Sequence, residues 1–223
     1  YSIQISKLFY ERFIKNDDIT LFSPNNVPGL YEAFGMPEFD ELYLKYEKDK
    51  SIPKSTIGAQ ELFMDLLKER AETGRIYIMN IDHCNTHSSF KDKVYMSNLC
   101  QEITLPTTPI QHIDDKEGEI ALCILSAINL GLLTDIDELE ELCDLSVRAL
   151  DEIIDYQEYP VEAAKISTQA RRSLGIGYIG LAHYLAKNQV SYEHKTAAKL
   201  VDKVTEAFQF YLLKASNNLA KEK

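Results

Sequence analysis

The sequence predicts a mixed α/β fold that is rich in helix. Short runs of β-branched and aromatic residues, such as 20–23 and 75–82, alternate with longer stretches whose apolar residues recur every three or four positions. Strands that alternate with helices along a chain are typical of parallel βα units. At 223 residues the chain is long enough to bury a substantial core.

The first half of the chain predicts three helices and two β segments. We expect a helix over 1–16, a short strand over 20–23 that ends in the turn SPNNVPG, and a helix over 28–49 that is interrupted near Gly35 and Pro37. An amphipathic helix over 57–73 should end at Gly74, and the β-rich run RIYIMNID follows it.

The second half predicts one strand and four helices. The segment NLCQEITLP and the polar turn HIDDKEGE precede an apolar run at 119–126, which is typical of a buried strand. Helical spacing of apolar residues predicts helices over 135–155, with Thr134 or Asp135 as N-cap, and over 161–173, 175–188 and 192–222. The chain begins without Met and its last helix has no Gly or Pro stop, so we expect a fragment.

Composition excludes several classes of protein. The net charge of −11, with no basic run, argues against a DNA-binding surface. No stretch approaches the roughly 20 apolar residues of a membrane span, and no signal-peptide pattern is present. Four cysteines, at 84, 100, 123 and 143, do not resemble a secreted disulfide framework. We expect a cytoplasmic protein with reduced or catalytic thiols.

The segment Asn98-Leu99-Cys100-Gln101-Glu102 holds the strongest candidate site. Pro106 and Pro109 disfavour a helix there, and in an extended segment alternate side chains share one face. Asn98, Cys100 and Glu102 would then point the same way and suit chemistry on a polar substrate. The alternative is that Cys100 and Cys123, 23 residues later, are ordinary buried cysteines.

The amino-acid sequences of many segments resemble those of one protein family. SNLCQEITLPTTP and GEIALCILSAINLG are similar to the active-site region of the large (alpha, catalytic) subunit of class I ribonucleoside-diphosphate reductase. Further segments of the chain match that family in order: LFSPNNVPGLYEAF, KYEKD, GRIYIMNIDHCNTHSSF, LDEIIDYQEYPVEAAK, RRSLGIG and FYLLKASN. The resemblance implies that residues 1–223 are a central part of a ten-stranded α/β barrel, made of two five-stranded halves, with NLCQE as its active-site finger loop.

The resemblance also implies roles for individual residues. Cys100 would form the thiyl radical that abstracts the ribose 3′ hydrogen, Glu102 would act as general base at the 3′-OH, and Asn98 would bind the ribose hydroxyls. Cys123 would be one of two redox-active cysteines, and Leu125 would line the sugar pocket, although a plain core role also fits it. The second redox cysteine lies upstream in the family, and neither Cys84 nor Cys143 matches it. We expect Cys143 to be structural.

Partners and cofactors follow from the same resemblance. The substrate would be a ribonucleoside diphosphate, which the family reduces to the deoxyribonucleotides needed for DNA replication. A metal-containing small (beta) subunit would supply the radical, and thioredoxin or glutaredoxin would be the reductant. We expect no cofactor or metal on this chain, no membrane or DNA partner, and an alpha homodimer completed by the remaining parts of the subunit. Nucleotide sites for allosteric control would lie outside the chain, and the isolated fragment should be inactive.

Two alternatives to this function remain open. One is a different thiyl-radical enzyme that shares the barrel. The other is a non-catalytic structural or assembly piece of a split alpha subunit.

Two shorter patterns have competing interpretations. His83-Cys84-x-x-His87 contains metal-ligand residue types, but no second cluster is present, and we favour a hydrogen-bonded segment that passes from strand to loop. Gly175-x-Gly177-x-x-Gly180 matches a dinucleotide fingerprint without the preceding strand, and we favour glycines that allow close helix packing.

Overall fold

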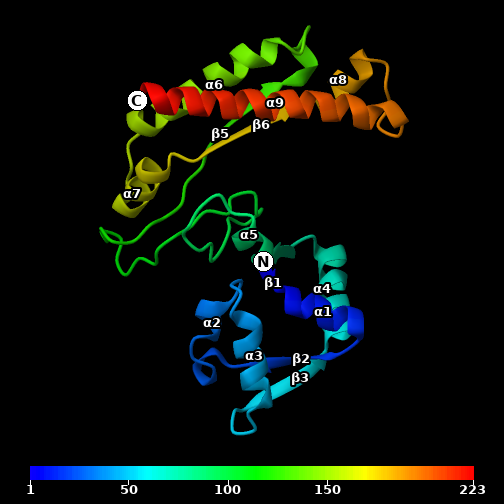
Figure 1. Ribbon diagram of the computed structural model, residues 1–223, viewed down its shortest axis with the longest axis vertical. Helices are drawn as coiled ribbons and strands as arrows, with labels where there is room; N and C mark the ends of the chain where they lie inside the picture. Colours follow the sequence, from blue (N-terminus) through cyan, green and yellow to red (C-terminus); the bar gives the residue numbers. More distant parts are fainter. The chain divides into compact units, whose positions relative to one another are not determined.

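Residues 1–223 are described by a computed structural model, whose strands and helices divide between two units, Tyr1–Thr107 and Thr108–Lys223 (Figure 1). The predicted helix-rich α/β class is confirmed. The strands form three two-stranded sheets, and each unit encloses its own hydrophobic core. None of the helices combines the length and the apolar composition that a membrane crossing requires.

The N-terminal unit contains one parallel and one antiparallel pair of strands. Its elements in order are β1 (Ser2–Ile5), α1 (Lys7–Lys15), β2 (Asp18–Phe22), a 3-10 turn η1 (Pro24–Asn26), α2 (Leu30–Ala33), α3 (Phe39–Lys48), β3 (Lys54–Gly58), α4 (Ala59–Thr73), β4 (Tyr77–Asn80) and α5 (Ile81–Thr86). β1 pairs with β4 in parallel, and β2 pairs with β3 in antiparallel fashion. The strand at β2, the broken helix at α2–α3 and the helix α4 confirm the predictions for those segments.

Local signals account for the helix ends in this unit. The Ser6 hydroxyl accepts a hydrogen bond from the Phe9 amide and caps α1, and Asn16, in the left-handed region with φ 58°, ends it. Gly74 ends α4 with φ 66°, as predicted. The predicted helix over 1–16 is wrong at its start, because Ser2–Ile5 forms β1 against a strand more than seventy residues further on.

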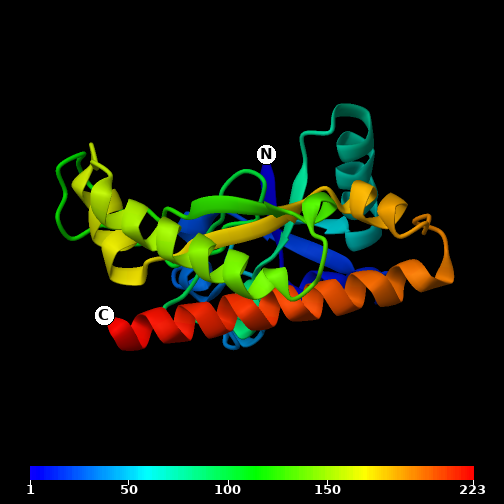
Figure 2. The ribbon, with the colours of Figure 1, turned by 90° about the horizontal axis from the view of Figure 1, so that it is seen from above.

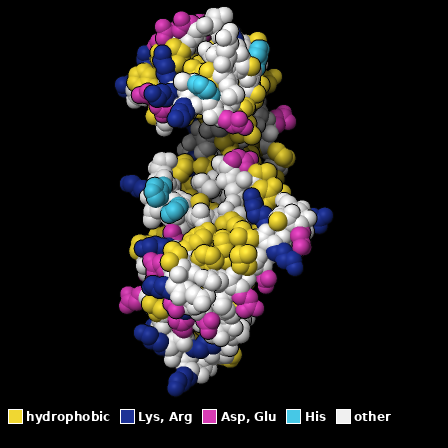
Figure 3. Space-filling model, turned by 90° about the vertical axis from the view of Figure 1, so that its right-hand side faces the viewer, with side chains coloured by type: hydrophobic (Ala, Val, Ile, Leu, Met, Phe, Trp, Pro, Cys, Tyr) yellow, Lys and Arg dark blue, Asp and Glu magenta, His cyan; other side chains and the backbone are white.

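The core of this unit joins α1, α3 and α4 to the strands. Its buried members are Ile5, Leu8, Phe9, Ile19, Ala33, Phe39, Tyr43 and Ala59. Phe13 and Phe63 continue the core as an edge-to-face pair with ring centroids 5.1 Å apart. Figure 3 shows a hydrophobic patch on the face of this unit where α1 and α4 lie. An apolar cavity of about 240 Å³ opens beside β1, and it contains none of the predicted site residues.

The C-terminal unit is built on one parallel strand pair covered by two long helices. Its elements are β5 (Ile124–Asn129), a 3-10 turn η2 (Leu130–Leu132), α6 (Glu138–Tyr156), α7 (Glu162–Arg171), β6 (Leu174–Ile179), α8 (Leu181–Lys187) and α9 (Lys195–Glu222). α9 lies along α6, and both cover the same face of the β5–β6 pair (Figures 1 and 2). The fully buried Leu139 and Cys143 of α6 pack against Val204 and Phe208 of α9.

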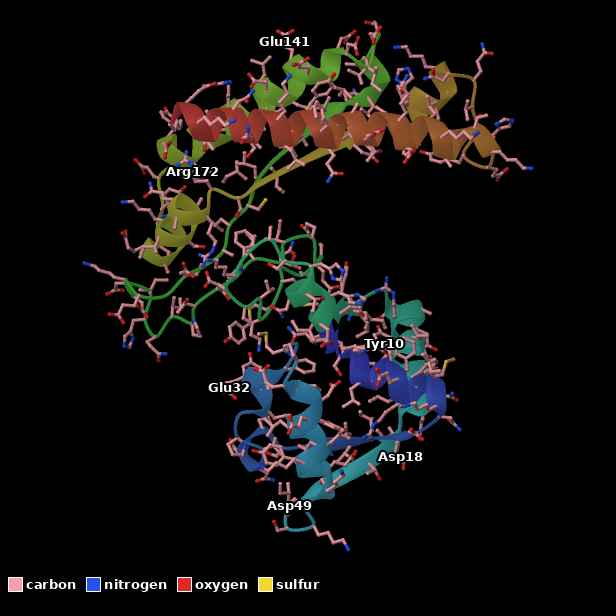
Figure 4. The ribbon with its side chains drawn as sticks, viewed as in Figure 1. Tyr10, Asp18, Glu32, Asp49, Glu141 and Arg172 are labelled. Atoms are coloured by element: carbon pink, nitrogen blue, oxygen red, sulfur yellow. The ribbon has the colours of Figure 1, made fainter.

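Charged side chains fix the junction between α7 and β6. Arg172, in the left-handed region with φ 47°, ends α7 and is labelled in Figure 4. Its guanidinium donates to Asp151 and Asp155 of α6 at 2.5 and 2.8 Å. The guanidinium of Arg172 therefore holds the pKa of the Asp151 carboxyl below its usual range.

Three predictions for this unit need correction. The predicted helix over 175–188 is instead strand β6 followed by α8, because residues 174–179 pair with β5 in parallel. The predicted buried strand over 119–126 begins only at Ile124 and runs to Asn129, and Leu125 is 62% exposed. The N-cap of α6 is Asp137, and the Glu138 carboxylate accepts hydrogen bonds from the amides of Thr134 and Asp135 instead.

Candidate active site

The segment that leads to the candidate cysteine is held by the side chain of Asn85. Asn85 lies on α5, and its amide bonds both backbone groups of Val94: the Val94 amide donates to Oδ1 at 2.8 Å, and Nδ2 donates to the Val94 carbonyl at 3.0 Å. The Val94 side chain is fully buried beside Met79 and Ile81. Lys93, the preceding residue, makes a second contact: its ammonium donates to the carbonyl of Glu32 on α2, a residue labelled in Figure 4.

Residues 98–101 form a tight turn. The Gln101 amide donates to the Asn98 carbonyl at 3.2 Å, and Gln101 has φ 70° while Leu99 and Cys100 keep negative φ. These features match a type I turn followed by a left-handed residue. The Asn98 amide donates to the Ile103 carbonyl at 3.4 Å, and the Ile103 amide donates to Asn98 Oδ1 at 3.0 Å. The side chain of Asn98 thus closes its own turn.

This turn corrects the predicted geometry of the segment. The segment is not helical, as expected, but it is not extended either, so alternation along a strand does not group its side chains. Cys100 instead occupies the tip of the turn, Asn98 is its first residue, and Glu102 lies one residue beyond its end. All three residues are exposed. The Oδ1 atom of Asn98 is engaged in the turn, which leaves its Nδ2 group as the donor that could meet a substrate.

Gln101 is a residue of this site that the sequence reasoning missed. Its Nε2 donates to Ser2 Oγ on β1 at 2.5 Å, which ties the tip of the turn to the parallel pair β1–β4. The only available signal was Asn98, a residue type that favours the first position of type I turns.

The second cysteine, Cys123, immediately precedes β5. Leu125 pairs with Gly175 in the parallel ladder, and the Ile124 amide donates to the Ser173 carbonyl at 3.2 Å. Cys123 and Leu125, two residues apart, both contact the position of Gly175. Glu119, just upstream, forms a mostly buried ion pair with Arg171 at 2.5 Å and fixes the approach to Cys123.

The predicted site residues therefore fall into two groups. Asn98, Cys100 and Glu102 share one turn in the N-terminal unit. Cys123 and Leu125 share one side of the β5–β6 pair in the C-terminal unit, where Leu125 is exposed rather than a core leucine.

The two other cysteines have structural surroundings. Cys143 is fully buried between α6 and α9, and burial raises the pKa of its thiol to about 11. Cys84, on α5, is partly buried, which also raises the pKa of its thiol. None of the four cysteines forms a disulfide. The environment of Cys143 agrees with the structural role expected from its place on an apolar helix face.

The two shorter motifs also receive definite positions. His83, Cys84 and His87 lie on and just after α5, a helix where we expected a strand passing into a loop, and no group of three His, Cys, Asp or Glu side chains is placed to hold a metal ion. Gly175 and Gly177 lie inside β6 rather than after a strand, and Gly180, with φ 74°, begins α8. Helix packing therefore does not explain Gly175 and Gly177, whereas Gly180 does lie in close contact with Asn129 and η2, where a methyl group would overlap Asn129 Oδ1.

Comparison with known proteins gives one consistent result. A family model described as "Ribonucleotide reductase, barrel domain" matches residues 1–223. The chain is 60% identical to the ribonucleoside-diphosphate reductase subunit alpha of Haemophilus influenzae, 58% to that of Buchnera aphidicola from Schizaphis graminum, and 57% to subunit alpha of reductase 1 of Escherichia coli. Each alignment covers 100% of this chain and 30% of the relative, so the chain spans about a third of the length of these proteins.

Proposed function

The chain belongs to the ribonucleotide reductase barrel-domain family, and from this membership we propose that it is the part of a class I alpha subunit that carries the radical thiol. The proposed reaction is the reduction of a ribonucleoside diphosphate to the deoxyribonucleotide. In this proposal residues 1–223 form a central part of the catalytic barrel domain, and the rest of the alpha subunit completes it.

The turn at 98–101 supplies the first group of proposed roles. Cys100, as a thiyl radical, removes the hydrogen atom from C3′ of the ribose. Glu102, one residue beyond the turn, accepts the proton of the 3′-OH as a general base. Asn98 donates from Nδ2 to a ribose hydroxyl, while its Oδ1 holds the Ile103 amide. The same side chain thus positions the loop and the sugar.

The β5–β6 pair supplies the second group. Cys123 and a second cysteine outside residues 1–223 are oxidised from two thiols to a disulfide, which releases two electrons and two protons. The substrate is reduced by these electrons, and its 2′-OH leaves as water. Leu125, exposed on the same side of the strand pair, lines the sugar pocket.

The remaining assignments concern partners outside the chain. A metal-containing small subunit supplies the radical, and thioredoxin or glutaredoxin restores the thiols. The parallel pairs β1–β4 and β5–β6 belong, in this proposal, to a ten-stranded barrel of two five-stranded halves, with the turn at 98–101 as its finger loop. Parallel sheets are normally covered on both faces, which is consistent with further strands and a second alpha subunit in the assembly.

One observation carries the proposal. The hydrogen bonds that shape the turn come from the backbone and from the side chains of Ser97, Asn98 and Gln101, and none comes from the thiol of Cys100 or the carboxylate of Glu102. Those two groups are exposed at a turn that is held without them. A thiol and a carboxylate that the fold does not need are available for chemistry on a bound sugar.

The test uses the complete alpha subunit with its small subunit and a reductant. Cys100→Ser and Glu102→Gln should each abolish the formation of deoxyribonucleotide and leave the melting temperature unchanged. Asn98→Asp keeps an acceptor for the Ile103 amide and replaces the Nδ2 donor with a charged carboxylate oxygen, so it should reduce kcat while the turn persists. Leu99→Ala, at an exposed neighbour in the same turn, is the matched control and should keep its activity.

The same measurement decides the alternative of a structural or assembly piece. Exposed apolar side chains on the β5–β6 pair, Leu125 and Ile179, would suit a purely structural contact with other strands. In that case Cys100→Ser would leave turnover intact, and a truncation of the chain would reduce only the assembly of the alpha subunit. The isolated chain should show no turnover in either case, because it lacks the second redox cysteine.

A further inference from the structure

The β5–β6 pair has one covered and one open face. Ile128, Ile176 and Tyr178 pack against α6 and α9 on the covered face. On the other face Leu125 is 62% and Ile179 55% exposed. The parallel register places Gly175 beside Leu125, and Gly177 beside Ala127, on this open face.

Gly175 lies directly beneath the thiol of Cys123. A methyl group on Gly175 would lie 2.8 Å from Cys123 Sγ and 2.5 Å from Leu125 Cδ2, whereas ordinary contacts begin at 3.4 Å. A methyl group on Gly177, two residues further along the same strand and face, would meet nothing within 4 Å. A side chain at Gly175 would thus meet the thiol and the leucine, whereas one at Gly177 would enter open space.

Backbone conformation does not require glycine at either position. Both residues lie in regular strand and neither has positive φ. Glycine within a strand costs about 0.5–1 kcal/mol relative to alanine. What an alanine at position 175 would change is therefore the space above the backbone, which its methyl group would fill.

We propose that Gly175 is a positioning residue for Cys123: by lacking a side chain, it leaves the space that Sγ occupies and so sets the direction of the redox thiol on the open face. This inference rests on the proposed redox role of Cys123. Leu125 can turn its exposed tip away from a new methyl group. Cys123 has only one side-chain bond about which to turn, so its sulfur must move by at least 0.6 Å, from 2.8 to 3.4 Å.

The test compares Gly175→Ala with Gly177→Ala in the complete alpha subunit. Displacement of a reacting atom by about 1 Å can cost about 100-fold in rate. We expect Gly175→Ala to lower kcat at least about tenfold with little change in KM, because substrate binding does not depend on the direction of the thiol. Gly177→Ala should keep kcat, and both variants should melt at or above the temperature of the unmodified protein.

Alkylation of individual thiols, followed by mass spectrometry on the reduced chain, gives an independent measurement. Gly175→Ala should change the rate at Cys123 and leave the rate at Cys100 unchanged, and Gly177→Ala should change neither. Equal kcat and equal Cys123 alkylation in the two glycine variants would overturn the inference.

Cys123→Ser, assayed in parallel, tests the redox role of Cys123 separately from the positioning role of Gly175. Full turnover by Cys123→Ser would refute the redox role itself and with it the inference about Gly175. Loss of turnover by Cys123→Ser together with an unaffected Gly175→Ala would refute only the positioning role. A fall in melting temperature for Gly175→Ala, with kcat and Cys123 alkylation unchanged, would assign Gly175 to stability and refute positioning.

Discussion

Replacement of Asn85 by alanine should loosen the segment that carries Cys100 without disturbing the core of either unit. The Asn85 side chain is the hydrogen-bond partner of both the amide and the carbonyl of Val94, at 2.8 and 3.0 Å. The Val94 side chain is fully buried, so solvent reaches these backbone groups poorly once the amide of Asn85 is removed. The segment from Val94 to the turn at Asn98 would then lose its hydrogen bonds to α5 and keep only the packing of Val94.

The magnitude follows from those two hydrogen bonds. Leaving one buried donor or acceptor unsatisfied costs about 1–3 kcal/mol. If the segment relaxes enough for water to reach one of the two groups, only the other group stays unsatisfied. The free energy that holds the segment closed then falls by about 2 kcal/mol. Since 1.4 kcal/mol corresponds to a factor of ten, the local opening constant should rise about 30-fold. Amide hydrogen exchange at Val94, measured by NMR or mass spectrometry, reports this constant directly.

The control is Asn188→Ala, which removes a single exposed hydrogen bond from Nδ2 to the Tyr184 carbonyl at 2.8 Å. Its exchange at Val94 should equal that of the unmodified chain. Unchanged protection of Val94 in Asn85→Ala would refute the reasoning, because it would mean that packing of Val94 alone holds the segment. In the complete alpha subunit, we expect Asn85→Ala to reduce kcat through the misplaced turn.

Two further predictions concern the C-terminal unit. Leu139→Ala, at a fully buried position of α6, should lower the free energy of unfolding by about 2–5 kcal/mol. Leu145→Ala, at a position 55% exposed on the same helix, should change that free energy little, and equal losses in urea unfolding would contradict the packing described. The pKa of Asp151 is depressed by Arg172, so its ionised form stabilises the fold above the usual carboxyl pKa, and that stabilisation is lost as pH falls through the depressed value. Urea midpoints from pH 6 down to about 2 should therefore fall less steeply for Asp151→Asn than for the unmodified chain, and parallel curves would show that the ion pair is not responsible.

The helices with regular apolar spacing could be predicted because their signals are local. In α6 and α9 the buried residues recur at helical intervals, in α4 the partly buried Leu62, Phe63 and Leu66 do so, and Gly74 marks the end of α4 at the predicted position. The strands were harder, because their identity depends on partners far along the chain. The local sequence of Ser2–Ile5 predicts the start of a helix, yet this segment pairs with β4, and no nearby residue indicates that pairing.

The same distinction explains what could be predicted of the candidate site. The grouping of an amide, a thiol and a carboxylate at alternate positions indicated Asn98, Cys100 and Glu102, and the resemblance of the surrounding segments to the reductase family indicated Cys123. Geometry could not be inferred in the same way. The turn at 98–101 depends on a left-handed Gln101, a residue type that rarely adopts φ 70°, and on the bond from its side chain to Ser2 at the other end of the unit.

The role proposed for Gly175 depends on strand register, which the local sequence does not reveal. Taken alone, Gly175-x-Gly177-x-x-Gly180 invites a nucleotide-binding or helix-packing interpretation, because the spacing of the glycines is all that is visible. The parallel pairing of Leu125 with Gly175 gives the first glycine a different meaning, since it places Cys123 Sγ over the absent side chain. A shift of one residue in that register would turn both glycines to the face covered by α6 and α9. The position of the thiol is therefore specified by strand pairing across about 50 residues of sequence, a distance over which local patterns carry no information.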